Sequence, residues 1–271
     1  MLGFSIAPKD LWQLSATLAA PQIIDVRPRD VFDEAAMLIP GAAWQDFAKA
    51  AEWAADLDDQ PIVVACKAGH DVSQVAVAQL RASGFDAAML AGGYEGWHAA
   101  GLPVVDKRAL DRIAPQRPSL WVTRRRPKID RIACPWLIRR FLDQQARILF
   151  VDPEEVIDVA RTSGGIPFDI KDVELSHEGE RCSFDTMLKL FGLESDPSLA
   201  QLALIVRGAD TARHDLVPEA AGLHAISLGL SALAGDDDHG LLQRGFLVYD
   251  GLFAWLRFAA DERHNWPAKA A

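Results

Sequence analysis

The chain has 271 residues, of which 50% are apolar and 24% are charged, so it is long enough for two globular domains that each bury a core. It carries 28 Lys and Arg against 38 Asp and Glu, a formal net charge of −10, and this acidic balance argues against a nucleic-acid partner. No apolar run approaches the length of a membrane span, and the three cysteines are too widely spaced for a disulfide framework. We therefore expect no membrane partner and a reducing, cytoplasmic setting.

The first part of the chain alternates strand patterns with helix patterns. Runs of apolar residues predict strands at 22–26, 61–65 and 87–90, and apolar spacings of three and four predict helices at 8–19, 44–56 and 72–83. Strands that alternate with helices form a parallel sheet flanked by helices. The fold class predicted for this part is therefore α/β.

A boundary between two domains is indicated by the three prolines within residues 103–118. We predict a first domain over residues 1–107, a linker over 108–118 and a second domain over 119–271. The spacing within 106–112 allows a short helix before the linker ends.

The most informative motif of the first domain is a predicted strand that ends in a single cysteine. Cys66 follows the strand, and a loop containing Gly69 leads into the helix predicted at 72–83. In such an arrangement the loop N–H groups and the positive end of the helix point at the sulfur. This favours a nucleophilic thiolate, whereas the alternative is a buried cysteine that only packs.

Four further segments frame this loop: Ile-Ile-Asp-Val-Arg at 23–27, Ile-Pro-Gly-Ala at 39–42, Leu-Ala-Gly-Gly-Tyr-Glu-Gly-Trp at 90–97 and Ala-Gly-Leu-Pro-Val at 100–104. In this order they resemble the motifs of a rhodanese domain. The resemblance implies that Cys66 is catalytic and carries a persulfide during sulfur transfer. It also implies that the surrounding loop binds the substrate, and we assign that role to Lys67, Gly69, His70 and Ser73.

The loop departs from the family pattern in its charges. Leu38 stands where the family usually has a His, and Asp71 and Val72 stand where many members have an Arg. The carboxylate of Asp71 disfavours anionic thiosulfate, and only Lys67 offers a compensating cation. Sulfur transfer or thiol redox chemistry is therefore favoured over efficient cleavage of thiosulfate.

The second domain has a different pattern. Strands are predicted at 120–123 and 147–151, with a helix at 134–145 between them whose first turn would hold Pro135. Further helices are predicted at 183–191, 197–208, 215–233 and 238–262. We therefore predict a helix-rich α+β domain.

A basic cluster opens this domain, since residues 117–140 hold 8 Lys and Arg and the single acid Asp130. Arginines between a strand and a helix suit an oxyanion, and we assign Arg124, Arg126 and Arg131 to such a site. The alternative is a solvated basic turn whose arginines pair with acids elsewhere.

A second cluster combines an imidazole, a thiol and a carboxylate, the groups that transition metals prefer. We assign His177, Cys182 and Asp185 as metal ligands, with Ser183 or Asp185 as a helix cap in the alternative interpretation. Asp210 interrupts an apolar helical run, so its carboxylate must be paired or bind something. No cofactor is predicted beyond this possible transition metal.

Six segments of the second domain carry another resemblance: Trp-Val-Thr at 121–123, the run from 126 to 141, Glu-Leu-Ser-His at 174–177, Gly-Glu-Arg-Cys-Ser-Phe-Asp at 179–185, Ile-Val-Arg-Gly-Ala-Asp-Thr at 205–211 and Ile-Ser-Leu-Gly-Leu at 226–230. Together they resemble the C-terminal domain of the chromate-resistance protein ChrB. The resemblance implies a role in chromate resistance with chromate as a candidate ligand. Longer members carry a separate regulatory segment in place of the rhodanese-like domain, so DNA binding is not expected.

Two hypotheses of function follow. In the first, the protein is an enzyme of the rhodanese sulfurtransferase type, with a small thiol or sulfur donor as partner and a second domain that binds an oxyanion or a metal. In the second, the protein is a sensor that detects chromate or thiol stress without turnover. Asp71 and the absent loop Arg discriminate between them, because they bear on whether Cys66 can transfer sulfur.

Overall fold

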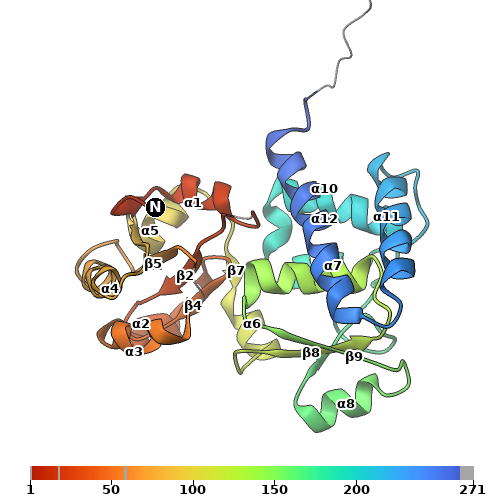
Figure 1. Cartoon of the computed structure of the whole chain (residues 1–271), viewed down its shortest axis with the longest axis horizontal. Coiled ribbons are helices and arrows are strands. Elements are labelled where there is room, and N and C mark those ends of the chain that lie inside the picture. The colour runs from red at the N-terminus through yellow and green to blue at the C-terminus, as the bar shows by residue number, and fades with distance from the viewer. Residues whose placement is uncertain (1, 18, 58–59, 263–271) are drawn as a thin grey trace, which may run out of the picture.

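The computed structural model describes residues 2–17, 19–57 and 60–262, which form two lobes side by side (Figure 1). The first lobe, up to residue 106, contains a sheet that has five strands within the described residues. Their order across the sheet is β1 (Ser5–Ile6), β6 (Ala87–Leu90), β5 (Ile62–Ala65), β2 (Gln22–Asp25) and β4 (Ala42–Trp44). All neighbouring pairs in it are parallel, which confirms the predicted α/β class.

Helices cover both faces of this sheet: α1 (Pro8–Leu14), α2 (Arg29–Glu34), α3 (Ala50–Trp53), α4 (Asp71–Ala82) and α5 (Gly93–Ala99). Consecutive residues of a strand point to opposite faces. Val63 therefore packs into the core shared with the second lobe, whereas Val64 and Cys66 pack with α4 in a separate core. This double coverage explains why every residue of β5 is apolar and buried.

The helix predicted at 44–56 is wrong at its start, and only Ala50–Trp53 of it is α-helical. The chain there forms the edge strand β4, then short 3-10 turns on either side of the four-residue helix α3. Ala43 pairs with Ile24 of β2, and the Asp46 carboxylate accepts the Ala48 N–H at 3.0 Å. Sheet pairing and this local cap therefore prevail over the helical spacing of the apolar residues.

The second lobe contains a parallel sheet with the strand order β10 (Ile166–Pro167), β8 (Leu120–Arg124) and β9 (Arg147–Val151). The helix α8 (Val156–Ser163) lies on one side of this sheet in Figure 1. The larger set of helices lies on the other: α7 (Asp130–Leu137), α9 (Ser183–Leu190), α10 (Pro197–Asp210), α11 (Glu219–Ala234) and α12 (Asp238–Phe258). The predicted helix-rich α+β fold is confirmed.

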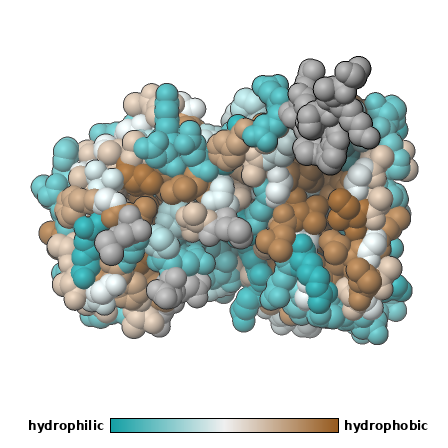
Figure 2. Space-filling model, turned by 45° about the horizontal axis from the view of Figure 1, so that its top comes forward, coloured by the Kyte–Doolittle hydropathy of each residue, from teal (hydrophilic) through white to brown (hydrophobic). Residues whose placement is uncertain are grey.

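The surface of the second lobe is apolar in places, and Figure 2 shows an extended hydrophobic area on it. Helix α11 contributes to the exposed apolar surface, because Ile226 and Leu233 point to solvent while Ser227 is buried. Within the described residues, no helix combines the length and the apolar character needed to cross a membrane.

Helix α7 begins four residues earlier than the helix predicted at 134–145. Ile129 has φ 34° and ψ −94°, which turns the chain so that Asp130 is the first helical residue. Pro135 therefore lies inside the helix rather than in its first turn, where its ring removes a backbone donor. The helix continues as a π-helical turn over Ile138–Leu142.

The two lobes share one continuous apolar core. The indole of Trp12 contacts the rings of Phe141 and Phe253, with centroids 5.9 and 6.4 Å apart. Strand β7 (Val105–Asp106) pairs with β3 (Met37–Leu38), and α6 (Lys107–Ile113) takes up the start of the predicted linker. The predicted limits of the two domains stay predictions.

Candidate functional site

The first candidate site lies at the carboxyl end of β5, where ligands of parallel sheets bind. Cys66 follows the strand directly, and its side chain faces the loop that leads into α4. The N–H of Gly69 donates a hydrogen bond to Cys66 Sγ at 3.2 Å, and the Oγ of Ser73 lies 3.3 Å from the same sulfur. Ser73 is oriented by donating to the His70 carbonyl at 2.8 Å. The sequence-predicted Cys66, Gly69 and Ser73 are thus brought together.

The start of α5 packs against this loop. The N–H groups of Tyr94 and Glu95 donate to the carbonyls of Cys66 and Lys67 at 2.8 and 2.9 Å. The φ of Gly69 is +74°, and a Cβ on this residue would lie 2.7–2.8 Å from the backbone nitrogens of Gly92 and Gly93. The Cys66 loop and the start of α5 can approach this closely only because the residues at the contact are glycines.

The polar side chains at the mouth of the loop are exposed. Lys67 lies 3.7 Å from Glu95, and both side chains are largely in solvent. His70 and Asp71 are also exposed, at the start of α4. Lys67, the cation that we expected to compensate for Asp71, is therefore paired with Glu95. Among these residues, every positive charge at the mouth of the loop has an acidic partner.

A buried ion pair anchors the neighbouring strand and was not predicted as part of a site. Arg27 Nη2 lies 2.6 Å from Asp25 Oδ2, and both side chains are almost inaccessible. The guanidinium stacks on the ring of Tyr94, 4.7 Å from its centroid. Arg27 therefore connects β2 to the start of α5, which contacts the Cys66 loop.

The second candidate site lies in the C-terminal lobe around His177. Three carboxylate oxygens surround the Nε2 of His177: Oδ2 of Asp210 at 3.2 Å, Oδ2 of Asp130 at 3.4 Å and Oδ1 of Asp169 at 3.5 Å. Asp130 opens α7 and Asp210 ends α10, whereas His177 precedes α9. The ligand atoms of Asp130, His177 and Asp210 all lie within 4.8 Å of one another.

Two of these carboxylates are fixed by the start of α9. Asp130 accepts the backbone N–H groups of Ser183 at 2.6 Å and of Phe184 at 3.2 Å. Asp169 accepts the Oγ–H of Ser183 at 2.8 Å through Oδ1. Its Oδ2 lies 3.1 Å from Arg124 Nη2 and 3.3 Å from Arg131 Nε. The cluster is therefore joined to two of the three predicted arginines.

The charges of this cluster change the protonation of its members. The three carboxylates that can accept from His177, with Asp130 the largest influence, raise the pKa of His177 to about 12. Burial raises the pKa of Asp130. Burial also acts to raise the pKa of Asp169, but hydrogen bonds from His177 and Ser183 and the two guanidinium groups prevail and lower it.

The structure does not bring Cys182 and Asp185 to His177. Asp185 Oδ2 accepts the N–H and the S–H of Cys182 at 3.0 and 3.2 Å, which is the helix-cap geometry of the alternative interpretation. Both carboxylate oxygens of Asp185 also accept hydrogen bonds from Arg207. Asp130 and Asp210 stand instead in the positions beside the imidazole.

Two other polar residues of this lobe, Arg126 and Asp250, have partners outside the cluster around His177. The side chain of Arg126 is exposed, and its backbone N–H donates to Asp238 at 2.9 Å. Asp250 accepts from the indole of Trp136 at 2.7 Å and pairs with Arg140. Arg126 therefore does not converge on Asp169 as Arg124 and Arg131 do.

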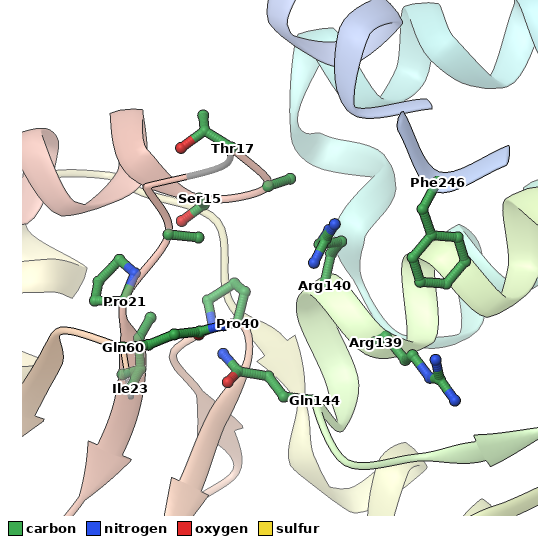
Figure 3. A pocket seen from close by; sticks show the side chains of 12 residues that line it. Ser15, Thr17, Pro21, Ile23, Pro40, Gln60, Arg139, Arg140, Gln144 and Phe246 are labelled. Atoms are coloured by element: carbon green, nitrogen blue, oxygen red, sulfur yellow. The ribbon is translucent and has the colours of Figure 1, made fainter. Parts of the chain in front are cut away.

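A cavity of about 360 Å³ lies between the lobes, with Ser15 and Pro40 on one side and Arg139, Arg140 and Phe246 on the other (Figure 3). Neither Cys66 nor His177 is among the described residues that line it. The cavity is therefore separate from both candidate sites.

Comparisons with known proteins match both lobes. The family model "ChrB, C-terminal domain" matches residues 121–256, and the model "Rhodanese-like domain" matches residues 7–100. Protein ChrB of Cupriavidus metallidurans is 35% identical over 134 residues, which cover 49% of this chain and 39% of that protein. The matched region thus spans about two-fifths of this relative's length.

Solved structures resemble the first lobe. A rhodanese-related protein from Thermoplasma volcanium is 27% identical and covers 38% of this chain and 98% of its own, with a TM-score of 0.34. A rhodanese-like domain protein from Staphylococcus aureus is 25% identical and covers 35% of this chain and 91% of its own, with a TM-score of 0.31. From its family matches, the chain belongs to the ChrB C-terminal domain family and carries a rhodanese-like domain ahead of that domain.

Proposed function

We propose that this protein transfers sulfur through a persulfide on Cys66 and takes part in chromate resistance in a reducing cytoplasm. The observation that carries the proposal is the environment of Cys66 Sγ, which accepts the Gly69 N–H at 3.2 Å beside the Ser73 hydroxyl. N–H groups directed at a sulfur stabilise negative charge on it, both on a thiolate and on the outer sulfur of a persulfide.

The proposed reaction has two half-steps. The thiolate of Cys66 attacks the outer sulfur of a donor persulfide, R–S–S⁻, so that a Cys66 S–S bond forms, the donor S–S bond breaks and the donor leaves as R–S⁻. An acceptor thiolate then attacks the outer sulfur and restores the Cys66 thiolate. Electrons balance between donor and acceptor, and no further oxidant is needed.

The charges at the loop favour a donor of low charge. Asp71 is exposed beside the loop, and Lys67 is near Glu95. A thiosulfate dianion would meet the Asp71 carboxylate with no unshared cation among these residues. We therefore propose the persulfide of a small thiol as donor.

In the second lobe, the arginines support the binding of an oxyanion such as chromate. Arg124 and Arg131 both point at Asp169 Oδ2, and the buried Nε of Arg124 has no hydrogen-bond partner among the described residues. A tetrahedral anion at the edge of this pair could accept the remaining N–H groups.

The second candidate function is that of a sensor in which Cys66 does not turn over. Here an uncharged peroxide, R–O–O–H, gives one oxygen atom to the Cys66 thiolate, which becomes a sulfenic acid while the peroxide is reduced to R–O–H. The observation that favours it is Asp71, in place of a loop arginine that would attract anionic donors.

Sulfurtransferase assays with a small-thiol persulfide as donor decide between the two functions. We expect turnover by the unchanged protein and by Cys134→Ala, whose cysteine is buried in the second lobe, but none by Cys66→Ser. Equal rates for the unchanged protein and Cys66→Ser would rule out the enzyme. Absence of turnover together with stoichiometric oxidation of Cys66 by a peroxide would favour the sensor.

A further inference from the structure

The carboxylates around His177 outnumber the hydrogens that its Nε2 can offer. One ring N–H can be directed at one acceptor, yet three oxygens lie 3.2–3.5 Å from this nitrogen. All three distances exceed the roughly 2.7–2.9 Å of a charge-assisted N–H···O bond. The arrangement therefore resembles a set of ligand atoms around a common centre more than an ion pair between two groups.

Apart from Asp169, two carboxylates share the single imidazole of His177, which can balance the charge of only one of them. Asp169 is compensated by the guanidinium groups of Arg124 and Arg131. Asp130 is 1% exposed and, among the described residues, accepts only backbone N–H groups apart from His177, and Asp210, at 19% exposure, also faces His177. Two largely buried carboxylates that share one imidazole call for a further positive charge.

The geometry points to a divalent metal ion bound by Asp130, His177 and Asp210, with Asp169 as a positioning residue. On binding, the imidazolium of His177 would release its proton to solvent, so that two carboxylates and a neutral imidazole make the site with its ion electrically neutral. This inference does not depend on the chemistry proposed for Cys66.

The ligand types restrict the class of metal. An imidazole nitrogen with two carboxylate oxygens suits Mn²⁺, Fe²⁺ or Zn²⁺ better than Ca²⁺ or Mg²⁺, which prefer oxygen alone. The soft ligands nearby are directed elsewhere, since the Cys182 thiol donates to Asp185 and burial raises its pKa well above 9. Copper(I) and other thiolate-bound metals are therefore disfavoured.

The site is open on one side. The side chain of His177 is 42% exposed, whereas Asp130 is buried, so three protein ligands would leave the solvent side for water or an anion. Arg124 and Arg131 are joined to this cluster by their ion pairs with Asp169. An oxyanion could therefore contact the metal and the guanidinium groups together, which would unite the two ligand classes expected for this domain.

Asp169 acts on the site through its neighbours. It receives the Ser183 hydroxyl on Oδ1 and both guanidinium groups on Oδ2. Carboxylates of this kind orient the ligating imidazole and the arginines around a metal. Its replacement by Asn is expected to weaken metal affinity by about 10–100-fold without abolishing binding.

The test uses the full chain, stripped with a chelator and titrated anaerobically with Mn²⁺, Fe²⁺ or Zn²⁺ by calorimetry and elemental analysis. We expect one ion per chain and a metal-dependent rise in the melting temperature. Asp210→Asn and His177→Gln should each lower the affinity by more than about tenfold and lose that rise.

Matched controls come from the same lobe. Asp215→Asn alters an exposed aspartate that pairs with Arg213, and His224→Gln alters a histidine whose Nδ1 faces the Ala209 carbonyl. Both should bind metal as the unchanged protein does. Asp130→Asn is not used, because Asp130 also caps α9 and its loss could unfold the lobe. The inference fails if the unchanged protein binds none of the three ions, or if Asp210→Asn and His177→Gln bind as tightly as it does.

Discussion

The hydroxyl of Tyr249 donates a 2.8 Å hydrogen bond to the carbonyl oxygen of Ile129, the residue before Asp130. Ile129 is β-branched and has φ 34°, a conformation that L residues rarely adopt. The bond joins α12 to the start of α7 and crosses a distance of 120 residues in sequence. Tyr249 thus holds in place the strained turn that directs Asp130 toward His177.

Replacing Tyr249 with Phe removes this bond, while the Ile129 carbonyl still accepts the N–H groups of Ile132 and Ala133. We expect Tyr249→Phe to lower the free energy of unfolding by about 0.5–1.5 kcal/mol and to weaken metal binding at Asp130. Urea unfolding and metal titration would measure the two effects. Tyr94→Phe, in the first lobe, is the control, and equal effects of both variants on metal binding would contradict this role of Tyr249.

Gly69→Ala is expected to disrupt the Cys66 loop. A Cβ at this position would lie under 3.0 Å from backbone atoms of Gly92, Gly93 and Leu90, which cannot move as a side chain can. Sulfurtransferase activity should fall by more than about tenfold, because the Gly69 N–H would move from the sulfur. Gly101→Ala is a matched control, since Gly101 has a similar φ of +67° and no atom within 4 Å of its Cβ position. Full activity of Gly69→Ala would exclude the N–H cradle as the basis of reactivity.

Alkylation should distinguish Cys66 from the other two cysteines. Burial raises the pKa values of the Cys134 and Cys182 thiols well above 9, so both stay protonated and unreactive near neutral pH. We expect iodoacetamide to modify only Cys66 in the native protein at pH 7.5, and all three cysteines after denaturation. Intact and peptide mass spectrometry would show this. Modification of native Cys66→Ser would mean that a second-lobe thiol is accessible.

Arg257 is expected to stabilise the junction between the lobes. It donates to the carbonyls of Ser15 and Trp12, and its guanidinium lies 5.2 Å from the Trp12 ring centroid. Arg257→Ala should lower the free energy of unfolding by about 1–3 kcal/mol. Arg244→Ala removes an exposed arginine of the same helix, 3.6 Å from Asp237, and should change stability by less than about 1 kcal/mol. Thermal unfolding of both variants measures the difference, and equal shifts would argue against an interlobe role.

Much of the fold could be predicted from the sequence, because the patterns that specify it are local. The strand at 62–65 is a run of apolar, mostly β-branched residues, and the helix at 71–82 has apolar residues at helical spacing. Cys66 lies between them, so its place at the carboxyl end of a parallel strand follows from connectivity alone. The same local information located α9, α10 and α12 in the second lobe.

The cluster around His177 could not be found in this way. Sequence proximity grouped His177 with Cys182 and Asp185, but those two cap α9. The carboxylates that surround His177 come from positions 130, 169 and 210, on separate elements. Two signals did point to them, since Asp130 is the single acid in a basic segment and Asp210 interrupts an apolar helical run.

Local patterns in the sequence were thus enough to predict the two fold classes and the place of Cys66 at a strand end, because backbone propensity and apolar periodicity act over a few residues. Only the tertiary structure decided which side chains meet at His177, because α7, α9 and α10 converge by packing their apolar faces into one core. That convergence depends on the shapes of all the packed side chains together. No spacing within the chain encodes it.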